Sequence, residues 1–126
     1  MRYLTMVKID ESMPFGPPPP ELFEAINKIG DENRKDGSLI LEGGLYPSAD
    51  GALVHLADGK VTVVDGPFTE AKEVIGGFAM FEVRSHEEAI ERARQFMQLH
   101  ADVWPECRAT VEVRRMYEQG EGPDFS

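Results

Sequence analysis

The sequence predicts an α+β domain in which one antiparallel sheet carries two helices on the same face. Two observations predict this class. Strand-like and helix-like segments follow one another in the order β-α-β, then a hairpin, then β-α-β. The chain has 126 residues, the usual length of one domain, and a chain of this size buries enough surface for a core without disulfides. We therefore expect a single domain over residues 1–126.

The first strand and the first helix are predicted near the N-terminus. Residues 2–9 alternate between two faces, as a strand does, with Tyr3 on one face and Lys8 on the other. The four prolines at 17–20 favour extended geometry and cannot lie inside a helix. We interpret them as a stiff lead-in to the helix, rather than as a ligand for an SH3-like module. The helix is predicted over 21–36 from three aliphatic residues at helical spacing: Leu22, Ile26 and Ile29.

The middle of the chain predicts two strands separated by a hairpin. Residues 39–46 predict a strand in which Gly43 and Gly44 indicate a bulge or a close approach of backbones. The pair Asp58-Gly59 lies between two β-rich runs, which is a strong signal for a tight hairpin turn. Residues 75–83 are the most apolar strand of the chain. Its apolar side chains point to both sides, so we expect both of its faces to be buried.

The last third of the chain predicts a second helix and a closing strand. Ser85 and Glu88 form a capping box, in which Ser85 accepts from the amide of Glu88 while the Glu88 side chain reaches back. Residues 110–116 predict the last strand, because they again alternate between two faces. Residues 119–126 are a polar tail that we expect to fray.

This order of elements is the split β-α-β, or ferredoxin-like, arrangement, in which both helices cover one face of the sheet. The other face is then uncovered, although the strand over 75–83 is apolar on both sides. A small domain does not leave such a face in water, and a second copy of the chain is the simplest cover. We therefore expect a homodimer with its sheets face to face, which is a dimeric α+β barrel.

Charge and composition exclude several classes of partner. The net charge of −10 argues against nucleic acid, which needs a basic patch, and against docking on anionic lipid. No apolar run approaches the roughly 20 residues of a membrane span, and residues 1–10 do not predict a signal peptide. The single Cys107 cannot form an intrachain disulfide and suits a reducing compartment. We therefore expect a cytoplasmic protein that contacts neither nucleic acid nor membrane.

One run of residues carries a family resemblance. The run VDGPFTEAKE at 64–73 is followed by Gly-Gly-Phe at 76–78, and Glu-Val-Arg at 112–114 precedes Met116. With these segments the chain resembles the YCII-related family, in the branch named for its Asp-Gly-Pro-Phe motif, over about residues 1–117. The resemblance implies a ferredoxin-like dimeric α+β barrel, the architecture already expected from the order of elements. The same superfamily includes muconolactone isomerases and small monooxygenases.

The resemblance also bears on the site and on partners. YCII relatives use a His–Asp pair in a cleft, with the histidine on the first helix. Residues 21–36 contain no histidine, so that pair does not transfer, and we carry over only Asp65 as a motif residue. Members of this branch are often encoded beside extracytoplasmic-function sigma factors, which implies a functional link to such a factor.

Asp65 and His100 are the first two candidate catalytic residues. Asp65 precedes Gly-Pro at the end of a strand, where a carboxylate either accepts backbone amides in a turn or orients a base. His100 lies on the apolar stripe of the second helix. An imidazole has an unperturbed pKa of about 6.5, which suits a general base, whereas a hydrogen-bonded residue at a helix end is the structural alternative.

Charged residues on the second face of the strands are further candidates. In the predicted alternation Glu42 shares its face with Tyr46, and Glu112 shares its face with Arg114. If this face lines a chamber between two copies, opposite charges there must pair or bind a ligand. Arg114 could clamp a carboxylate and Glu42 could act as a base, with Tyr46 and Glu112 beside the substrate. An exposed rim is the alternative.

Lys72 follows the motif turn, where it lies either in a solvated loop or in a loop that closes over a ligand. The three histidines are scattered without metal-ligand spacing, and no glycine-rich phosphate loop is present. We therefore expect neither a metal nor another cofactor. Two functions follow: a lyase or isomerase that moves protons on an unidentified small molecule, or a non-catalytic ligand-binding or regulatory module.

Overall fold

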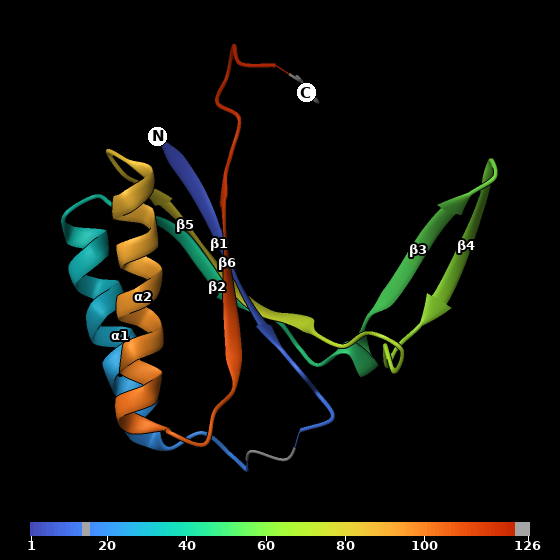
Figure 1. The fold of residues 1–126 in the computed structure, drawn as a ribbon, viewed down its shortest axis with the longest axis horizontal. Helices are drawn as coiled ribbons and strands as arrows, with labels where there is room; N and C mark the ends of the chain where they lie inside the picture. The colour runs from blue at the N-terminus through green and yellow to red at the C-terminus, as the bar shows by residue number, and fades with distance from the viewer. Residues whose placement is uncertain (14–15, 123–126) are drawn as a thin grey trace.

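We describe the fold from a computed structural model, which covers residues 1–13 and 16–122. The predicted elements occur in the predicted order (Figure 1). They are β1 (Arg2–Ile9), α1 (Pro20–Lys35), β2 (Leu39–Gly44), the 3-10 turn η1 (Ser48–Asp50), β3 (Ala52–Ala57), β4 (Lys60–Asp65), β5 (Val74–Glu82), α2 (His86–Val103) and β6 (Ala109–Arg115). The predicted tail over 119–126 falls partly outside the described residues, and those of its residues that are described are exposed.

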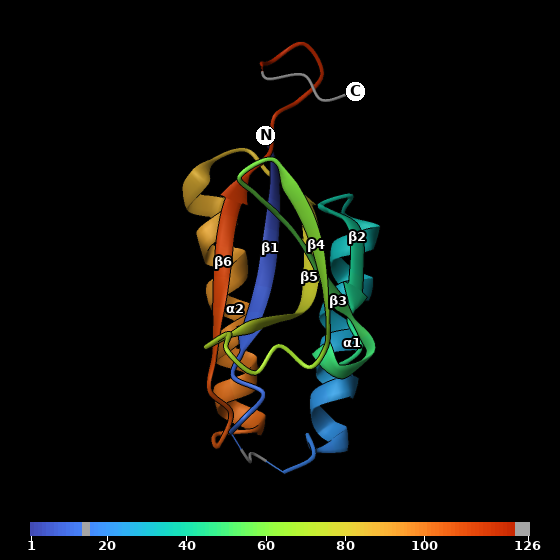
Figure 2. The ribbon, with the colours of Figure 1, turned by 90° about the vertical axis from the view of Figure 1, so that its right-hand side faces the viewer.

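The main sheet has the strand order β2-β5-β1-β6, and each neighbouring pair is antiparallel. Both helices cover the same face of this sheet (Figures 1 and 2). The α+β, ferredoxin-like class is therefore confirmed. The core at this face includes Tyr3, Val83 and Ala89, which are 2%, 4% and 1% exposed. We call the opposite side of the sheet the open face.

Local sequence explains where the helices begin. Pro19, with φ −67° and ψ 148°, is the extended residue before α1, and Pro20 occupies the first turn, where a missing amide hydrogen costs nothing. At α2 the hydroxyl of Ser85 accepts from the amide of Glu88 at 3.1 Å, as predicted. The Glu88 carboxylate reaches back to the amide of Arg84 at 3.0 Å, one residue earlier than a standard capping box.

The strands β3 and β4 form a separate two-stranded sheet, which we call the arm. Its tight turn has Asp58 at φ 52° and Gly59 at φ 74°, the left-handed geometry that an Asp-Gly hairpin turn requires. Every residue of both strands is exposed. The arm projects away from the sheet and its helices (Figure 1).

The base of the arm is held by the Asp-Gly-Pro-Phe motif and η1. The Glu11 carboxylate accepts from the amide of Ser48 at 2.7 Å and from its hydroxyl. The Ser48 hydroxyl in turn accepts from the amide of Phe68 at 3.0 Å. A Cβ at Gly66 would overlap the Ser48 carbonyl oxygen, so this position needs glycine. The motif therefore ties the arm to the end of β1.

Candidate functional site

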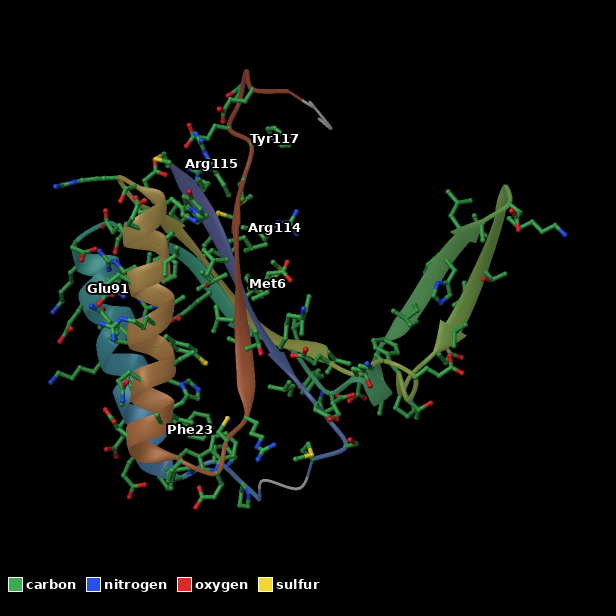
Figure 3. All side chains as sticks on the ribbon, viewed as in Figure 1. Met6, Phe23, Glu91, Arg114, Arg115 and Tyr117 are labelled. Atoms are coloured by element: carbon green, nitrogen blue, oxygen red, sulfur yellow. The ribbon has the colours of Figure 1, made fainter. Side chains whose placement is uncertain are left out.

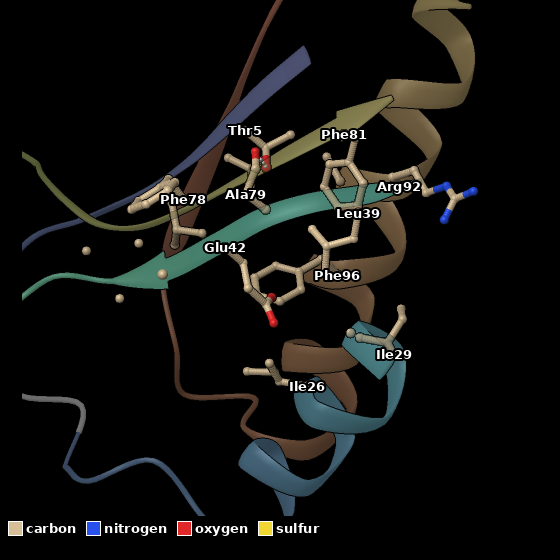
Figure 4. A pocket seen from close by; sticks show the side chains of 18 of the residues that line it. Thr5, Ile26, Ile29, Leu39, Glu42, Phe78, Ala79, Phe81, Arg92 and Phe96 are labelled. Atoms are coloured by element: carbon tan, nitrogen blue, oxygen red, sulfur yellow. Dashed lines mark hydrogen bonds between the residues drawn. The ribbon is translucent and has the colours of Figure 1, made fainter. Parts of the chain in front are cut away.

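A cavity of about 520 Å³ lies between the main sheet and the two helices (Figure 4). Its volume is in the range of small-molecule sites, and its lining is mostly apolar with a few polar groups, as such sites are. Aromatic and aliphatic walls come from both helices and from the sheet, including Phe23, Ile26, Phe81 and Phe96. The polar lining residues include Glu42, His100, Asn33 and Arg92.

Glycines open the cavity where β2 and β5 pair. The pairing places Gly43 opposite Phe78 and Gly44 opposite Gly77, and the backbone at Gly43, Gly44, Gly76 and Gly77 lines the cavity. A Cβ at Gly44 would meet nothing within 4 Å. The missing side chains therefore provide part of the open volume. The paired glycines in the sequence were the available signal for this feature.

Glu42 faces the helices, so the prediction that it shares the open face with Glu112 and Arg114 is wrong. The register of β2 shifts between Leu39 and Leu41, and this irregularity leaves Glu42 opposite Ala79, on the helix side (Figure 4). Its side chain is 35% exposed and accepts from Nη1 of Arg34 at 2.6 Å.

A glycine in α1 leaves room for the Glu42 carboxylate and its partner Arg34. A Cβ at Gly30 would lie 3.1 Å from Oε1 of Glu42 and 3.2 Å from Nη2 of Arg34. A glycine inside a helix costs about 1 kcal/mol relative to alanine, and here its absent side chain makes room for the ion pair. Hydrogen bonds to Asp31, and then to Glu42, raise the pKa of Arg34.

His100 lines the same cavity from α2. Its Nδ1 lies 2.8 Å from the carbonyl oxygen of Phe96, and the two rings are 4.7 Å apart. A carbonyl oxygen only accepts, so Nδ1 carries the hydrogen. In the neutral ring Nε2 is then the basic nitrogen, which is the form that a proton acceptor needs.

Arg92 and Asn33 are lining residues that the sequence analysis did not single out. Nη1 of Arg92 donates to Oδ1 of Asn33 at 2.7 Å and to the hydroxyl of Ser38 at 2.9 Å. The Arg92 side chain is 20% exposed, and it fixes α2 to the end of α1. Only the fold brings these residues together, since they lie 59 positions apart.

Glu112 and Arg114 lie on the open face, as predicted, with Lys8 beside them. Figure 3 labels Arg114, whose side chain points away from the helices. Oε1 of Glu112 accepts from Nζ of Lys8 at 3.3 Å, and Oε2 accepts from Nη1 of Arg114 at 3.2 Å. The hydrogen bond from Lys8, and then that from Arg114, lower the pKa of Glu112. This charged row is away from the cavity.

The other predicted site residues lie elsewhere. Asp65 ends β4 at the base of the arm, and its exposed carboxylate has no hydrogen-bond or ion-pair partner within residues 1–13 and 16–122. Tyr46 is 86% exposed, between β2 and η1. Lys72 borders a second hollow of about 610 Å³, near Glu11 and Phe68. Of the seven predicted site residues, the cavity therefore brings together only Glu42 and His100.

Two searches of the described residues gave negative results. Across residues 1–13 and 16–122, no group of three or more His, Cys, Asp or Glu side chains is arranged to hold a metal ion. In the same part of the chain, neither helix has the length and apolar character needed to cross a membrane.

Comparison with known proteins gives the family. The sequence model of the YCII-related domain matches residues 1–116. The chain belongs to this family. It is also 32% identical, over 81 residues, to an uncharacterised protein of Rhizobium meliloti (strain 1021). That similarity covers 63% of this chain and 61% of the relative, so the chain spans less than two thirds of the relative's length.

Proposed function

We propose that this YCII-related chain is a lyase or isomerase that moves a proton on a small organic molecule bound between the sheet and the helices. The observation that carries the proposal is a single cavity lined by both a carboxylate, Glu42, and an imidazole, His100, among apolar walls. Carboxylate and imidazole are the side chains that most often transfer protons in enzymes.

The two groups suit different roles. The Glu42 carboxylate is a proton acceptor held against α1 by Arg34. His100 has its Nδ1 hydrogen committed to a carbonyl oxygen, so that its Nε2 accepts or returns a proton. The group that takes a proton from a carbon atom then holds it and can return it, either to another carbon, which shifts a double bond, or to the leaving group of an elimination. Such chemistry needs no metal or nucleotide.

The lining also restricts the substrate class. Aromatic and aliphatic side chains favour a molecule with an apolar body, and the amide of Asn33 offers a hydrogen bond to a polar group. A lactone or an unsaturated carboxylic acid has both features. We therefore propose this class as the ligand.

The open face supports the proposal that the working unit is a homodimer, and the single Cys107 suits the cytoplasmic location that we propose for it. Leu41 is 52% exposed on that face, on the edge strand opposite to the one that carries Glu112 and Arg114. Two sheets packed face to face would cover it. In that dimer Glu112 and Arg114 would line the space between the copies.

The test is a thermal-shift screen against carboxylates and lactones. A ligand of the cavity should raise the melting temperature of the wild type, and Gly44→Leu, which fills the cavity, should remove that shift. Gly122→Leu is the matched control, because a Cβ there also meets nothing within 4 Å and Gly122 lies in the C-terminal segment. A shift that persists in Gly44→Leu would contradict the cavity as the site.

Turnover of the ligand then separates catalysis from binding. Glu42→Gln should retain the thermal shift and lose turnover by roughly 100-fold or more, since a general base contributes about that factor. Nuclear magnetic resonance of the ligand over time gives the rate. Equal turnover by the variant would remove Glu42 from the mechanism.

A second candidate is a non-catalytic ligand-binding or regulatory module, linked to an extracytoplasmic-function sigma factor. The observation in its favour is that α1 carries no histidine, whereas the family's expected pair needs one there. Binding of a ligand without any turnover would support this candidate over the enzyme.

A further inference from the structure

The arm has one face made almost entirely of aliphatic side chains. Cross-strand pairing places Val54 opposite Val63 and Leu56 opposite Val61. Because side chains alternate along a strand, these four residues share one side, which we call the aliphatic face. Their exposed fractions lie between 65% and 75%. No described part of the chain covers them.

The other face of the arm is polar towards its tip. His55 pairs with Thr62, and Ala57 with Lys60, on that side. A lone two-stranded hairpin is marginally stable in water, and it becomes stable when one face packs on another layer. The difference between the two faces indicates which side packs. The aliphatic face is the one that needs a partner.

The open face of the main sheet is the matching uncovered surface. Its apolar residues are Leu4, Met6, Leu41, Phe78 and Met80. In Figure 2 the arm stands in front of this side of the sheet, with strands running alongside those behind it. Every residue of the arm is nevertheless exposed, so the arm does not pack on the sheet of its own chain.

Size favours a second copy as the partner for both surfaces. A stable interface buries roughly 800 Å² on each partner and involves about 20–30 residues a side. The arm offers two strands in which all residues are exposed, and the open face offers one side of a four-stranded sheet. The 12 residues of the arm and about half of the 30 residues in the main sheet fall together within that range of residue numbers, whereas the arm alone does not.

Charge favours the same pairing. The alternation places Asp65 on the aliphatic face, at its base, where the carboxylate is exposed. The open face carries one more cation than acids among the residues of β1, β5 and β6: Arg2, Lys8 and Arg114 against Glu82 and Glu112. Arg114 is 70% exposed and is therefore available to a carboxylate from outside.

We propose that two copies of this chain exchange arms, so that the aliphatic face of each arm packs on the open face of the other copy's sheet. The inference rests on the proposed homodimer and adds the element that locks it. In one two-fold arrangement each arm covers part of the partner's open face, and the rest of the two open faces pack on each other, so that neither surface is left without a partner. Asp65 of each arm then lies among the cations of the partner's open face.

Disulfide trapping between two different variants tests the contact directly. Both variants carry Cys107→Ser; one adds Val63→Cys on the aliphatic face and the other adds Met80→Cys on the open face. After the two are unfolded and refolded together, oxidation should give a cross-linked pair on a non-reducing gel. Thr62→Cys in place of Val63→Cys is the matched control on the polar face, and it should give none. Equal cross-linking by both would overturn the proposal.

Sedimentation separates this proposal from the homodimer itself. Val63→Lys should weaken dimer formation roughly tenfold or more, whereas Thr62→Lys should leave it unchanged. A wild type that stays monomeric at micromolar concentration would overturn both the dimer and the arm exchange. A dimer that Val63→Lys leaves unchanged would overturn only the arm exchange. Neither measurement depends on the cavity or on its ligand.

Discussion

The main sheet with its helices and the arm use similar strand residues, yet they differ completely in burial. Tyr3 in β1 is 2% exposed, whereas Val63 in β4 is 65% exposed. Both strands alternate, and both pair antiparallel with a neighbour. The difference is that two helices cover one side of β1, and no described element covers the arm (Figure 1). The alternation of side chains along a segment predicts a strand, whereas packing against other elements determines which of its side chains are buried.

The two regions meet at the Asp-Gly-Pro-Phe motif. Here Ser48 donates hydrogen bonds to Glu11 and accepts one from the amide of Phe68, and together with the absent side chain of Gly66 these contacts fix the base of the arm. The motif that carries the family resemblance therefore lies at this junction, outside the cavity that holds Glu42 and His100. Its geometry gives it a structural role.

The largest expected loss of stability comes from truncating a side chain that is buried between the main sheet and the helices. Tyr3→Ala should lower the free energy of unfolding by roughly 3–5 kcal/mol, because it removes a buried aromatic ring and its hydrogen bond to His86. Tyr46→Ala, at an 86% exposed tyrosine, should change it by less than about 0.5 kcal/mol. Urea unfolding of both variants measures the difference, and equal losses would contradict the assigned core.

The junction between the two regions is the next target. Gly66→Ala should cost roughly 3 kcal/mol, at the upper end of overpacking costs, because its Cβ overlaps the Ser48 carbonyl. Gly44→Ala, which adds a Cβ in open space, is the matched control and should be nearly neutral. The same urea unfolding experiment applies. A neutral Gly66→Ala would mean that the arm is not fixed at its base.

A smaller effect is expected at the start of α2, on the covered side of the sheet. Ser85→Ala should reduce the free energy of unfolding by about 1 kcal/mol, because it removes the acceptor for the Glu88 amide. Ser85→Asp supplies another acceptor and should restore most of that loss. Thermal unfolding followed by circular dichroism distinguishes them. Equal melting temperatures in all three proteins would contradict the capping role.

The smallest effect concerns the charged row on the open face. The pKa of Glu112 is lowered in the folded chain, so its stabilising contribution is present above the unfolded value and is lost as pH falls through the folded value. The free energy of unfolding should therefore fall less steeply in acid, below about pH 4.5, in Glu112→Gln than in the wild type. Lys8→Met should show the same change, since Lys8 is the main cause of the shift. Identical acid slopes would contradict the pairing.

Features set by neighbouring residues could be predicted from the sequence. The hairpin turn needs only Asp58-Gly59, and the start of α2 needs only Ser85 and Glu88. The order of elements then gave the ferredoxin-like class, since few topologies accept that order. The homodimer, by contrast, stays a prediction.

The candidate site was harder to predict, because it depends on one irregular residue and on long-range packing. A single shift of register in β2 reverses the face of every side chain after it, and this turned Glu42 towards the helices. The contact between Arg92 and Asn33 depends on how α2 lies against α1. The local signs that space would be needed there were Gly30 and the glycine pairs at 43–44 and 76–77.

The glycines where β2 and β5 pair have a consequence for how the cavity can change among relatives of this chain. A single nucleotide change converts a glycine codon into one for alanine or valine, and at Gly44 the added carbons would project into empty space. Such substitutions reduce the volume of the cavity without changing Glu42 or His100. If the proposed function holds, the size of the ligand that is bound can therefore change while Glu42 and His100 stay in place, and members of the family should differ first in ligand size.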